Sequence, residues 1–195
     1  MKLRREVPLY LIIGKSTELV RRIRRFTAAK KKCIVLKHIS DKQRNQVDDV
    51  TTHDLQTFKA VTYSTLTDFI NHENLYHVDV IGIDEGQWFK DVVWLSEILA
   101  NCGKIVIIAA LDGSFQRKPF LYLDGSSILN LIPLAEEVIK LTAICQYCSK
   151  SASFTKRIVE SKEIELIGGA ESYHATCRAC FYKEEEEKEY PHEKL

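Results

Sequence analysis

Four cysteines stand in two pairs with the spacing that is typical of metal ligands. Cys145 and Cys148 form one Cys-X-X-Cys motif, and Cys177 and Cys180 form a second one after 28 intervening residues. Each pair can present two thiolates from a tight turn, and two such turns complete a tetrahedral four-sulfur zinc site. Because sulfur would fill all four positions, we expect the zinc to be structural rather than catalytic. Chance pairing or two separate redox motifs are the alternatives.

A second group of residues has the types that bind phosphate. Gly14-Lys15-Ser16-Thr17 lies between an apolar run and a helical pattern. In a P-loop, the lysine at this place contacts the β- and γ-phosphates of a nucleotide, and the next hydroxyl contacts Mg²⁺. The full motif G-x-x-x-x-G-K-S also needs a glycine five positions before Gly14, where this chain has Leu9. The loop is therefore about five residues short, and without its backbone amides we expect weaker ATP binding.

Two adjacent carboxylates follow another apolar run. The segment Val80–Ile83 ends in Asp84-Glu85, which is typical of a Walker B strand. Asp84 could bind Mg²⁺ directly or through a water molecule, and Glu85 could accept a proton from an attacking hydroxyl group. An acidic strand end that faces solvent is the alternative. Together with the Gly-Lys-Ser-Thr segment, however, the pair favours phosphoryl transfer.

The elements that must position these residues alternate between strands and helices. The apolar runs that predict strands are 9–13, 33–36, 78–83 and 104–111. Helical spacing predicts helices over 16–30 and 92–101, with Gly103 as a stop for the second one. Because the strand runs are continuous rather than alternating, we expect parallel strands in an α/β fold, covered by helices on both faces.

Three further segments bear on the organisation of the chain. The polar segment 40–52 is predicted to be a surface loop, and Asp124-Gly125 within 121–127 is a turn signal. The pattern changes near Thr142, where short strands and paired cysteines replace the α/β alternation. We therefore expect a P-loop-like α/β domain at 1–141, a zinc-binding lasso domain at 142–182 and a disordered acidic tail at 183–195.

Composition excludes several classes of protein. The 195 residues are 45% hydrophobic and 28% charged, with a formal net charge of +1. These values are ordinary for a globular protein, and no overall basic field favours nucleic acid as a partner. No run of about 18 apolar residues predicts a membrane span. Six cysteines without a secretory signal indicate a reducing compartment, so we expect a cytoplasmic protein.

Taken together, these motifs resemble the thymidine kinases of the cytosolic cellular and poxvirus type, from about Leu11 to Tyr182. The resemblance is carried by both cysteine pairs and by the segments 14–19, 83–87, 110–120, 128–131, 141–143 and 167–170. It implies a P-loop α/β domain with a small zinc-bearing lasso domain. It also implies transfer of the γ-phosphate of ATP to the 5′-hydroxyl of thymidine or deoxyuridine, with Mg²⁺, in nucleotide salvage. Members of the family are usually homotetramers.

The resemblance also implies a role for each candidate site residue. Glu85 matches the catalytic base and Asp84 the aspartate of the magnesium site. The other implied ATP and Mg²⁺ contacts are Gly14, Lys15, Ser16, Thr17, Asp41 and Gln87. The implied nucleoside contacts are Trp88, Leu111, Phe115, Phe120, Tyr173 and the lasso residues Ile164, Glu165, Leu166, Ile167 and Gly168.

Two departures from the family pattern leave alternatives open. The phosphate loop is short, and the segment 121–127 is longer than the family's link to Ile128. The chain could therefore be a catalytically impaired homologue that still binds nucleosides. A zinc-ribbon binding module is the rival from another class, and it would bind nucleic acid with a steep dependence on salt.

Overall fold

The computed structural model describes residues 8–14, 16–40, 49–51, 57–72, 75–159 and 172–189. The chain divides into two compact units. The first comprises Met1–Asp112 and Pro119–Lys140, and the second comprises Gly113–Lys118 and Leu141–Leu195. The short segment Gly113–Lys118 therefore leaves the first unit and belongs to the second.

The first unit is built on a six-stranded sheet with the order β5-β2-β6-β7-β1-β8. Every neighbouring pair in this sheet is parallel, as the continuous apolar runs predict. The strands are β1 (Leu9–Ile13), β2 (Cys33–His38), β5 (Val61–Tyr63), β6 (Val80–Ile83), β7 (Ile105–Ala110) and β8 (Glu137–Lys140). The predicted α/β class is confirmed.

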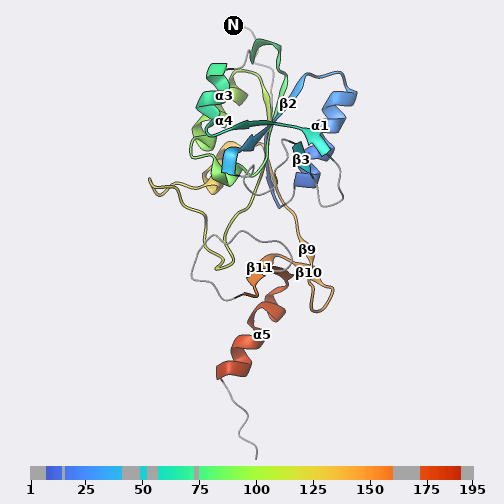
Figure 1. The fold of residues 1–195 in the computed structure, drawn as a ribbon, viewed down its shortest axis with the longest axis vertical. Coiled ribbons are helices and arrows are strands. Elements are labelled where there is room, and N and C mark those ends of the chain that lie inside the picture. Colours follow the sequence, from blue (N-terminus) through green and yellow to red (C-terminus); the bar gives the residue numbers. More distant parts are fainter. Residues whose placement is uncertain are drawn as a thin grey trace, which may run out of the picture. The chain divides into compact units, whose positions relative to one another are not determined.

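Helices cover both faces of this sheet, with α1 on one side and α3 and α4 on the other (Figure 1). The helical segments are α1 (Ser16–Ala28), α3 (Leu66–His72), η1 (Leu75–His77), η2 (Gly86–Trp88), α4 (Val92–Asn101) and η3 (Ile128–Leu134). Alternate strand residues face opposite layers, which explains why whole strands are apolar. Leu11 and Ile81 belong to the core cluster that includes the residues of α3, α4 and η3.

The opposite face of the sheet packs against α1 through its buried residues Leu19, Val20 and Ile23. A Cβ atom on Gly82 of β6 would lie 3.0 Å from the Cδ1 of Ile23, so the glycine lets the helix approach the sheet closely. The exposed and half-buried positions of α1 carry its arginines. One of them, Arg22, donates to Glu137 of β8 at 3.0 Å and ties the helix to the edge of the sheet.

Both predicted helices of the first unit end with the same backbone motif. Gly103 after α4 has φ 84, and the next N–H, of Lys104, donates to the Leu99 carbonyl at 3.1 Å. Lys30 after α1 has φ 61, and the N–H of Lys31 donates to the Phe26 carbonyl at 3.0 Å. These are Schellman motifs, in which one left-handed residue terminates a helix. The predicted stop at Gly103 is confirmed, and α1 ends two residues before Lys30.

The prediction of a surface loop over 40–52 is wrong at its end. Strand β3 (Asp49–Thr51) pairs with β4 (Thr57–Lys59) in an antiparallel ladder. The segment was mistaken for a loop because it is polar, although its β-branched Val50 and Thr51 favour a strand. The predicted turn within 121–127 is present. Gly125 has φ 79, and its N–H donates to the Tyr122 carbonyl at 3.0 Å.

The second unit consists of two small antiparallel ladders and one helix. Strand β9 (Ala143–Ile144) pairs with β10 (Ser151–Ala152), and β11 (Phe154–Arg157) pairs with β12 (Tyr173–Thr176). Helix α5 spans Arg178–Glu189. The acidic segment that begins at Lys183 therefore starts as a helix, not as the disordered tail expected at 183–195. Glutamate and lysine are strong helix formers, and α5 already begins before the acidic run. Among the described residues, no helix has the length and apolarity needed to cross a bilayer.

Candidate functional site

The carboxyl ends of three neighbouring strands bring the predicted phosphate and carboxylate residues to one edge of the sheet. Ile13 of β1 pairs with Ala110 of β7, and Ile83 of β6 pairs with Ile108 of β7. Gly14, Asp84 and Leu111 follow at this edge. In open parallel sheets ligands bind outside the carboxyl ends of the strands, so this edge is the candidate site of the first unit.

The connection from β1 to α1 is two residues long, because β1 ends at Ile13 and α1 begins at Ser16. Gly14 adopts φ 143, a left-handed value that favours glycine, and its N–H donates to the Ala110 carbonyl at 3.0 Å. Lys15 lies outside the described residues. A full P-loop wraps phosphates with several amides, whereas here the amides of the first turn of α1 remain. The shortened loop seen in the sequence is thus a tight turn in the fold.

Asp84 is buried, with 4% of its surface exposed. The Ser16 side chain, the Glu85 backbone and the positive charge of Lys37 act on this carboxyl group and lower its pKa. Burial, followed by the charge of Glu85, raises the pKa of Asp84 to about 7. Ser16 and Asp84 thus meet as the sequence predicts, and both offer oxygen atoms of the kind that Mg²⁺ prefers.

Lys37 is a further residue of this edge, and no sequence motif identifies it. It is 2% exposed, at the carboxyl end of β2. Buried lysines are rare unless they are paired, so one at a strand end beside a carboxylate is a functional signal. The sequence signal that could have identified this residue is a single lysine within the apolar strand pattern of 33–38.

Glu85 sits at a sharp turn that begins η2. Its backbone is left-handed, with φ 52 and ψ 45. Gly86 follows, and a Cβ atom there would lie 2.6 Å from the Cγ2 of Ile108. The turn therefore packs directly against β7, and this close packing requires glycine at position 86.

Gln87 holds the same turn through its side chain. Its amide donates to the carboxylate of Glu85, and its oxygen accepts a 3.0 Å hydrogen bond from the N–H of Leu111. Gln87 is only 3% exposed. It therefore links the predicted base with a predicted nucleoside contact.

Thr17, another predicted nucleotide contact, lies in the first turn of α1 and is half-buried.

Aromatic side chains of the first unit gather beside this turn. The ring centroids of Trp88 and Phe120 are 5.9 Å apart. The hydroxyl of Tyr122 donates to the carbonyl of Gly86 across 3.5 Å, and this tyrosine packs against the core cluster. Because Tyr122 belongs to the segment 121–127, this longer segment contacts the turn that follows Glu85.

Two other predicted nucleoside contacts belong to the second unit, where one arginine joins them. The guanidinium carbon of Arg157 lies 3.8 Å from the ring centroid of Phe115. Its Nη2 donates to the Tyr173 hydroxyl at 2.8 Å. No sequence pattern identifies Arg157, because a single arginine in a short strand is not distinctive. The remaining predicted contacts, Lys15, Asp41 and Ile164–Gly168, lie outside the described residues.

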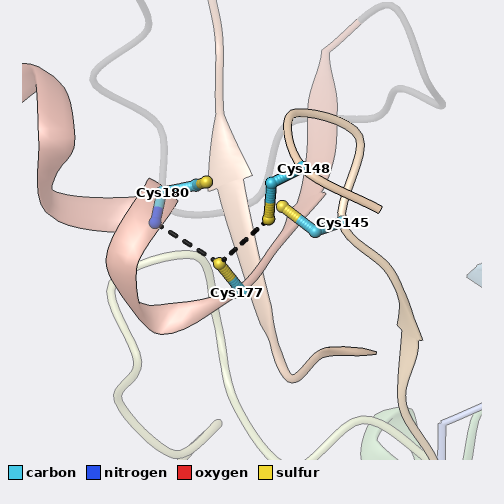
Figure 2. Close-up of side chains that lie close together, drawn as sticks. All are labelled: Cys145, Cys148, Cys177 and Cys180. Carbon is cyan, nitrogen blue, oxygen red and sulfur yellow. Dashed lines mark hydrogen bonds between the residues drawn. The ribbon is translucent and has the colours of Figure 1, made fainter. Parts of the chain in front are cut away.

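The four paired cysteines form one cluster in the second unit. Figure 2 shows their sulfur atoms directed toward one another from the turn between β9 and β10 and from the start of α5. All four lie within 4.8 Å of one another, and the sulfur atoms of Cys148 and Cys177 are 3.6 Å apart. Tetrahedral zinc with bonds of about 2.3 Å needs sulfur atoms roughly 3.8 Å apart. The cluster fits a four-thiolate zinc ion.

Hydrogen bonds from the backbone favour the thiolate form of Cys145 and Cys177, whereas the neighbouring Cys148 and Cys177 side chains raise the pKa of Cys180 to about 12. Burial opposes ionisation of Cys145, but the backbone amides of Cys177, Tyr147 and Cys148 outweigh it and lower its pKa to about 6. The N–H of Cys180 lies 3.5 Å from the sulfur of Cys177 and lowers the pKa of that thiol. Because zinc binds thiolates, these donors prepare the site for the metal.

Comparison with known proteins gives a consistent result. A family model described as "Thymidine kinase" matches residues 9–181. The chain is 51% identical to human "Thymidine kinase, cytosolic" over 170 residues, which cover 87% of this chain and 69% of the human protein. It is 51% identical to "Thymidine kinase 1" of Dictyostelium discoideum over 177 residues, covering 89% and 75%. The vaccinia virus (strain Western Reserve) "Thymidine kinase" is 51% identical over 168 residues, covering 86% and 90%.

Proposed function

The chain belongs to the thymidine kinase family, and on this premise we propose that it transfers the γ-phosphate of ATP to the 5′-hydroxyl of thymidine or deoxyuridine. The observation that carries the proposal is the family match, which spans both the phosphate edge of the sheet and the cysteine cluster. The geometry of Ser16, Asp84 and Glu85 at that edge supports the same reaction.

In the proposed reaction, Glu85 is the general base. It accepts the proton of the 5′-hydroxyl while the nucleoside oxygen attacks the γ-phosphorus and ADP leaves. The amide of Gln87 holds the Glu85 carboxylate, and the contact of Gly86 with Ile108 fixes the turn. The carboxylate is thereby oriented before the substrate arrives, which lowers the cost of reaching the reactive geometry.

Asp84 and the hydroxyl of Ser16 would hold Mg²⁺, since both supply oxygen atoms beside the start of α1. The ion would neutralise charge that develops on the phosphates of ATP. Lys15, Gly14, Thr17, Asp41 and Gln87 are the further proposed contacts on the nucleotide side. Because the β1–α1 connection has only two residues, we expect the amides at the start of α1 to bind the phosphates, with lower affinity than a full P-loop provides.

Pyrimidine recognition is proposed for flat apolar side chains and for backbone groups. The proposed contacts are Trp88, Leu111, Phe120, Phe115, Tyr173 and Ile164–Gly168. Aromatic rings give a pyrimidine base apolar surface at a small cost in side-chain entropy. The zinc ion is proposed to be structural, in a lasso domain at 142–182 that follows a kinase domain at 1–141. A homotetramer in the cytoplasm, active in nucleotide salvage, completes the proposal.

Phosphorylation of radiolabelled thymidine by the purified protein with ATP and Mg²⁺ tests this function, with Glu85→Gln as the matched control. We expect product with the wild type and a loss of at least a hundredfold in the variant, the usual size of a general-base effect of about 10²–10⁴. Stabilisation against heat by thymidine without any turnover would instead indicate an impaired nucleoside-binding homologue. Salt-sensitive binding of nucleic acid without turnover would indicate a zinc-ribbon module.

A further inference from the structure

Arg157 lies where three segments of the second unit that are distant in sequence come together. It is the last residue of β11 and pairs directly with Tyr173 of β12 in the antiparallel ladder. Phe115 comes from the segment Gly113–Lys118, which enters this unit from elsewhere in the chain. The guanidinium group covers Phe115 at 3.8 Å, lies 5.3 Å from the Tyr173 ring centroid and bonds the Tyr173 hydroxyl at 2.8 Å.

The chemistry of arginine suits this double contact. A guanidinium group is planar, so its face can stack on one ring while N–H groups at its edge donate to a hydroxyl. A lysine ammonium group has no such face, and it could make only one of the two contacts well. Arg157 is half-buried, so its contacts are shielded from competing water more than those of an exposed arginine.

The segment Gly113–Lys118 has a second attachment that does not involve Arg157. Arg117 stacks on Phe181 and Tyr182 of α5, at 4.7 and 4.8 Å from their ring centroids. The backbone of this segment also closes on itself, because Ser114 donates to the Lys118 carbonyl at 2.9 Å. Loss of Arg157 should therefore leave the segment attached through Arg117, while Phe115 and Tyr173 lose their contacts with the guanidinium group.

We propose that Arg157 is a positioning residue for nucleoside binding, which holds Phe115 and Tyr173 in the one arrangement that receives the pyrimidine nucleoside. This inference rests on the proposed function, in which both aromatic residues contact that substrate. The guanidinium covers one face of Phe115, so the ligand must use the other face or the edge of the ring. Arg157 acts through these two side chains and does not itself contact the substrate.

Thymidine binding to the full-length, zinc-loaded protein tests the inference, with calorimetry in the absence of ATP. Arg157→Met keeps the apolar stem of the side chain and removes the guanidinium, and Arg157→Lys restores the charge alone. Arg178→Met is the matched control, since Arg178 stacks on Phe154 in the same unit at 4.8 Å, a contact that includes neither Phe115 nor Tyr173. Zinc content and melting temperature report whether each variant folds.

We expect Arg157→Met to raise the Kd for thymidine by roughly 3- to 30-fold, the range for a cation–π contact that is partly to fully shielded from water. Arg157→Lys should recover only part of this loss, and Arg178→Met should bind within about twofold of the wild type. In kinetics, the KM for thymidine should rise while the KM for ATP stays constant. In the background of Phe115→Leu, Arg157→Met should cost less than it does alone, because the two residues act together.

The outcomes separate the inference from the proposed function. Equal thymidine affinity of the wild type and of zinc-loaded Arg157→Met would overturn the positioning role and leave the kinase proposal standing. Loss of zinc or of folding in both Arg157 variants would also overturn it, because Arg157 would then be a structural residue. A wild type that neither binds nor phosphorylates thymidine would overturn the proposed function, and the inference with it.

Discussion

The side chain of Gln87 joins Glu85 to Leu111, because its oxygen accepts a 3.0 Å hydrogen bond from the Leu111 N–H while its amide donates to the Glu85 carboxylate. The turns after β6 and β7 are thereby fastened to each other at the edge of the sheet where the reaction is proposed. A buried amide that serves two partners is costly to replace, since both partners lose a hydrogen bond.

Gln87→Met should therefore impair both stability and turnover. The change keeps the volume of the side chain but leaves the Leu111 N–H without this acceptor, which should cost about 1–3 kcal/mol of unfolding free energy. Thymidine turnover should fall by more than the loss of stability explains, because the Glu85 carboxylate also loses its hydrogen-bond donor. Urea unfolding and thymidine phosphorylation measure the two effects. Gln116→Met, at an exposed position, is the control, and equal behaviour of the two variants would contradict the bridging role of Gln87.

Gly86→Ala should destabilise the first unit, because its Cβ atom would lie 2.6 Å from the Cγ2 of Ile108. Overpacking of this kind typically costs about 1–3 kcal/mol. The double variant Gly86→Ala/Ile108→Ala should lose less than the sum of the two single changes, since the second change removes the clashing methyl group. Thermal unfolding of all three variants measures this, and simple additivity would show that the turn relaxes away from β7.

Asp84→Asn should stabilise the protein at high pH but not at low pH. The pKa of Asp84 is raised by burial to about 7, above the ordinary value of 3.8. Between these values the folded protein keeps a proton that the unfolded chain has released, so stability falls as pH rises. The variant has no such loss, and its advantage should grow from little near pH 4 to about 2–4 kcal/mol at pH 8.

Urea unfolding of the wild type and Asp84→Asn at pH 5, 6.5 and 8 without Mg²⁺ checks this prediction. Both proteins have the same cysteines, so the pH dependence of zinc binding cancels in their difference. A difference that stays constant across this range would contradict the raised pKa.

Cys177→Ser should release the metal from the second unit. Loss of one of four thiolates weakens a structural zinc site strongly, and binding energy at such a site is folding energy. The zinc content, measured by inductively coupled plasma mass spectrometry, should fall from one ion per chain toward zero. The second unit should lose ordered structure at the same time. Cys102→Ser is the control, because Cys102 is exposed and lies outside the cluster. Full zinc retention in Cys177→Ser would contradict the four-sulfur assignment.

Completing the phosphate loop should improve ATP binding. Insertion of a glycine and four further residues between Ile13 and Gly14 restores G-x-x-x-x-G-K-S. Each additional amide bonded to a charged phosphate is worth about 1.5–3 kcal/mol, so the KM for ATP should fall by about tenfold or more. The KM for thymidine should not change. An equal insertion after Gly125, in the exposed turn, is the control, and an unchanged KM for ATP would show that the tight turn is already sufficient.

The sequence predicted those parts of the fold that depend on local apolar pattern. Continuous runs located β1 and the carboxylates after β6, and Gly103 marked the end of α4 because its φ 84 is easiest for glycine. Strand β3 was not predicted because the surrounding segment 40–52 is mainly polar, although Val50 and Thr51 are β-branched. The helical start of the segment from Lys183 was missed because a run of glutamates suits both a helix and a solvated tail.

Long-range contacts made by single charged residues could not be predicted. The cysteines had a diagnostic spacing, and they meet as expected. Arg157 has none, and its role depends on Phe115 and Tyr173 being brought to it from distant segments. The role of Lys37 similarly depends on the pairing of β2 with β6, which brings the lysine close to Asp84.

The passage of Gly113–Lys118 into the second unit means that no contiguous piece of this chain encodes that unit. A fragment that starts at Leu141 would lack Phe115, and Phe181 and Tyr182 would lose the guanidinium of Arg117 that stacks on them. A fragment cut at Leu141 would therefore lack part of the packing of the second unit.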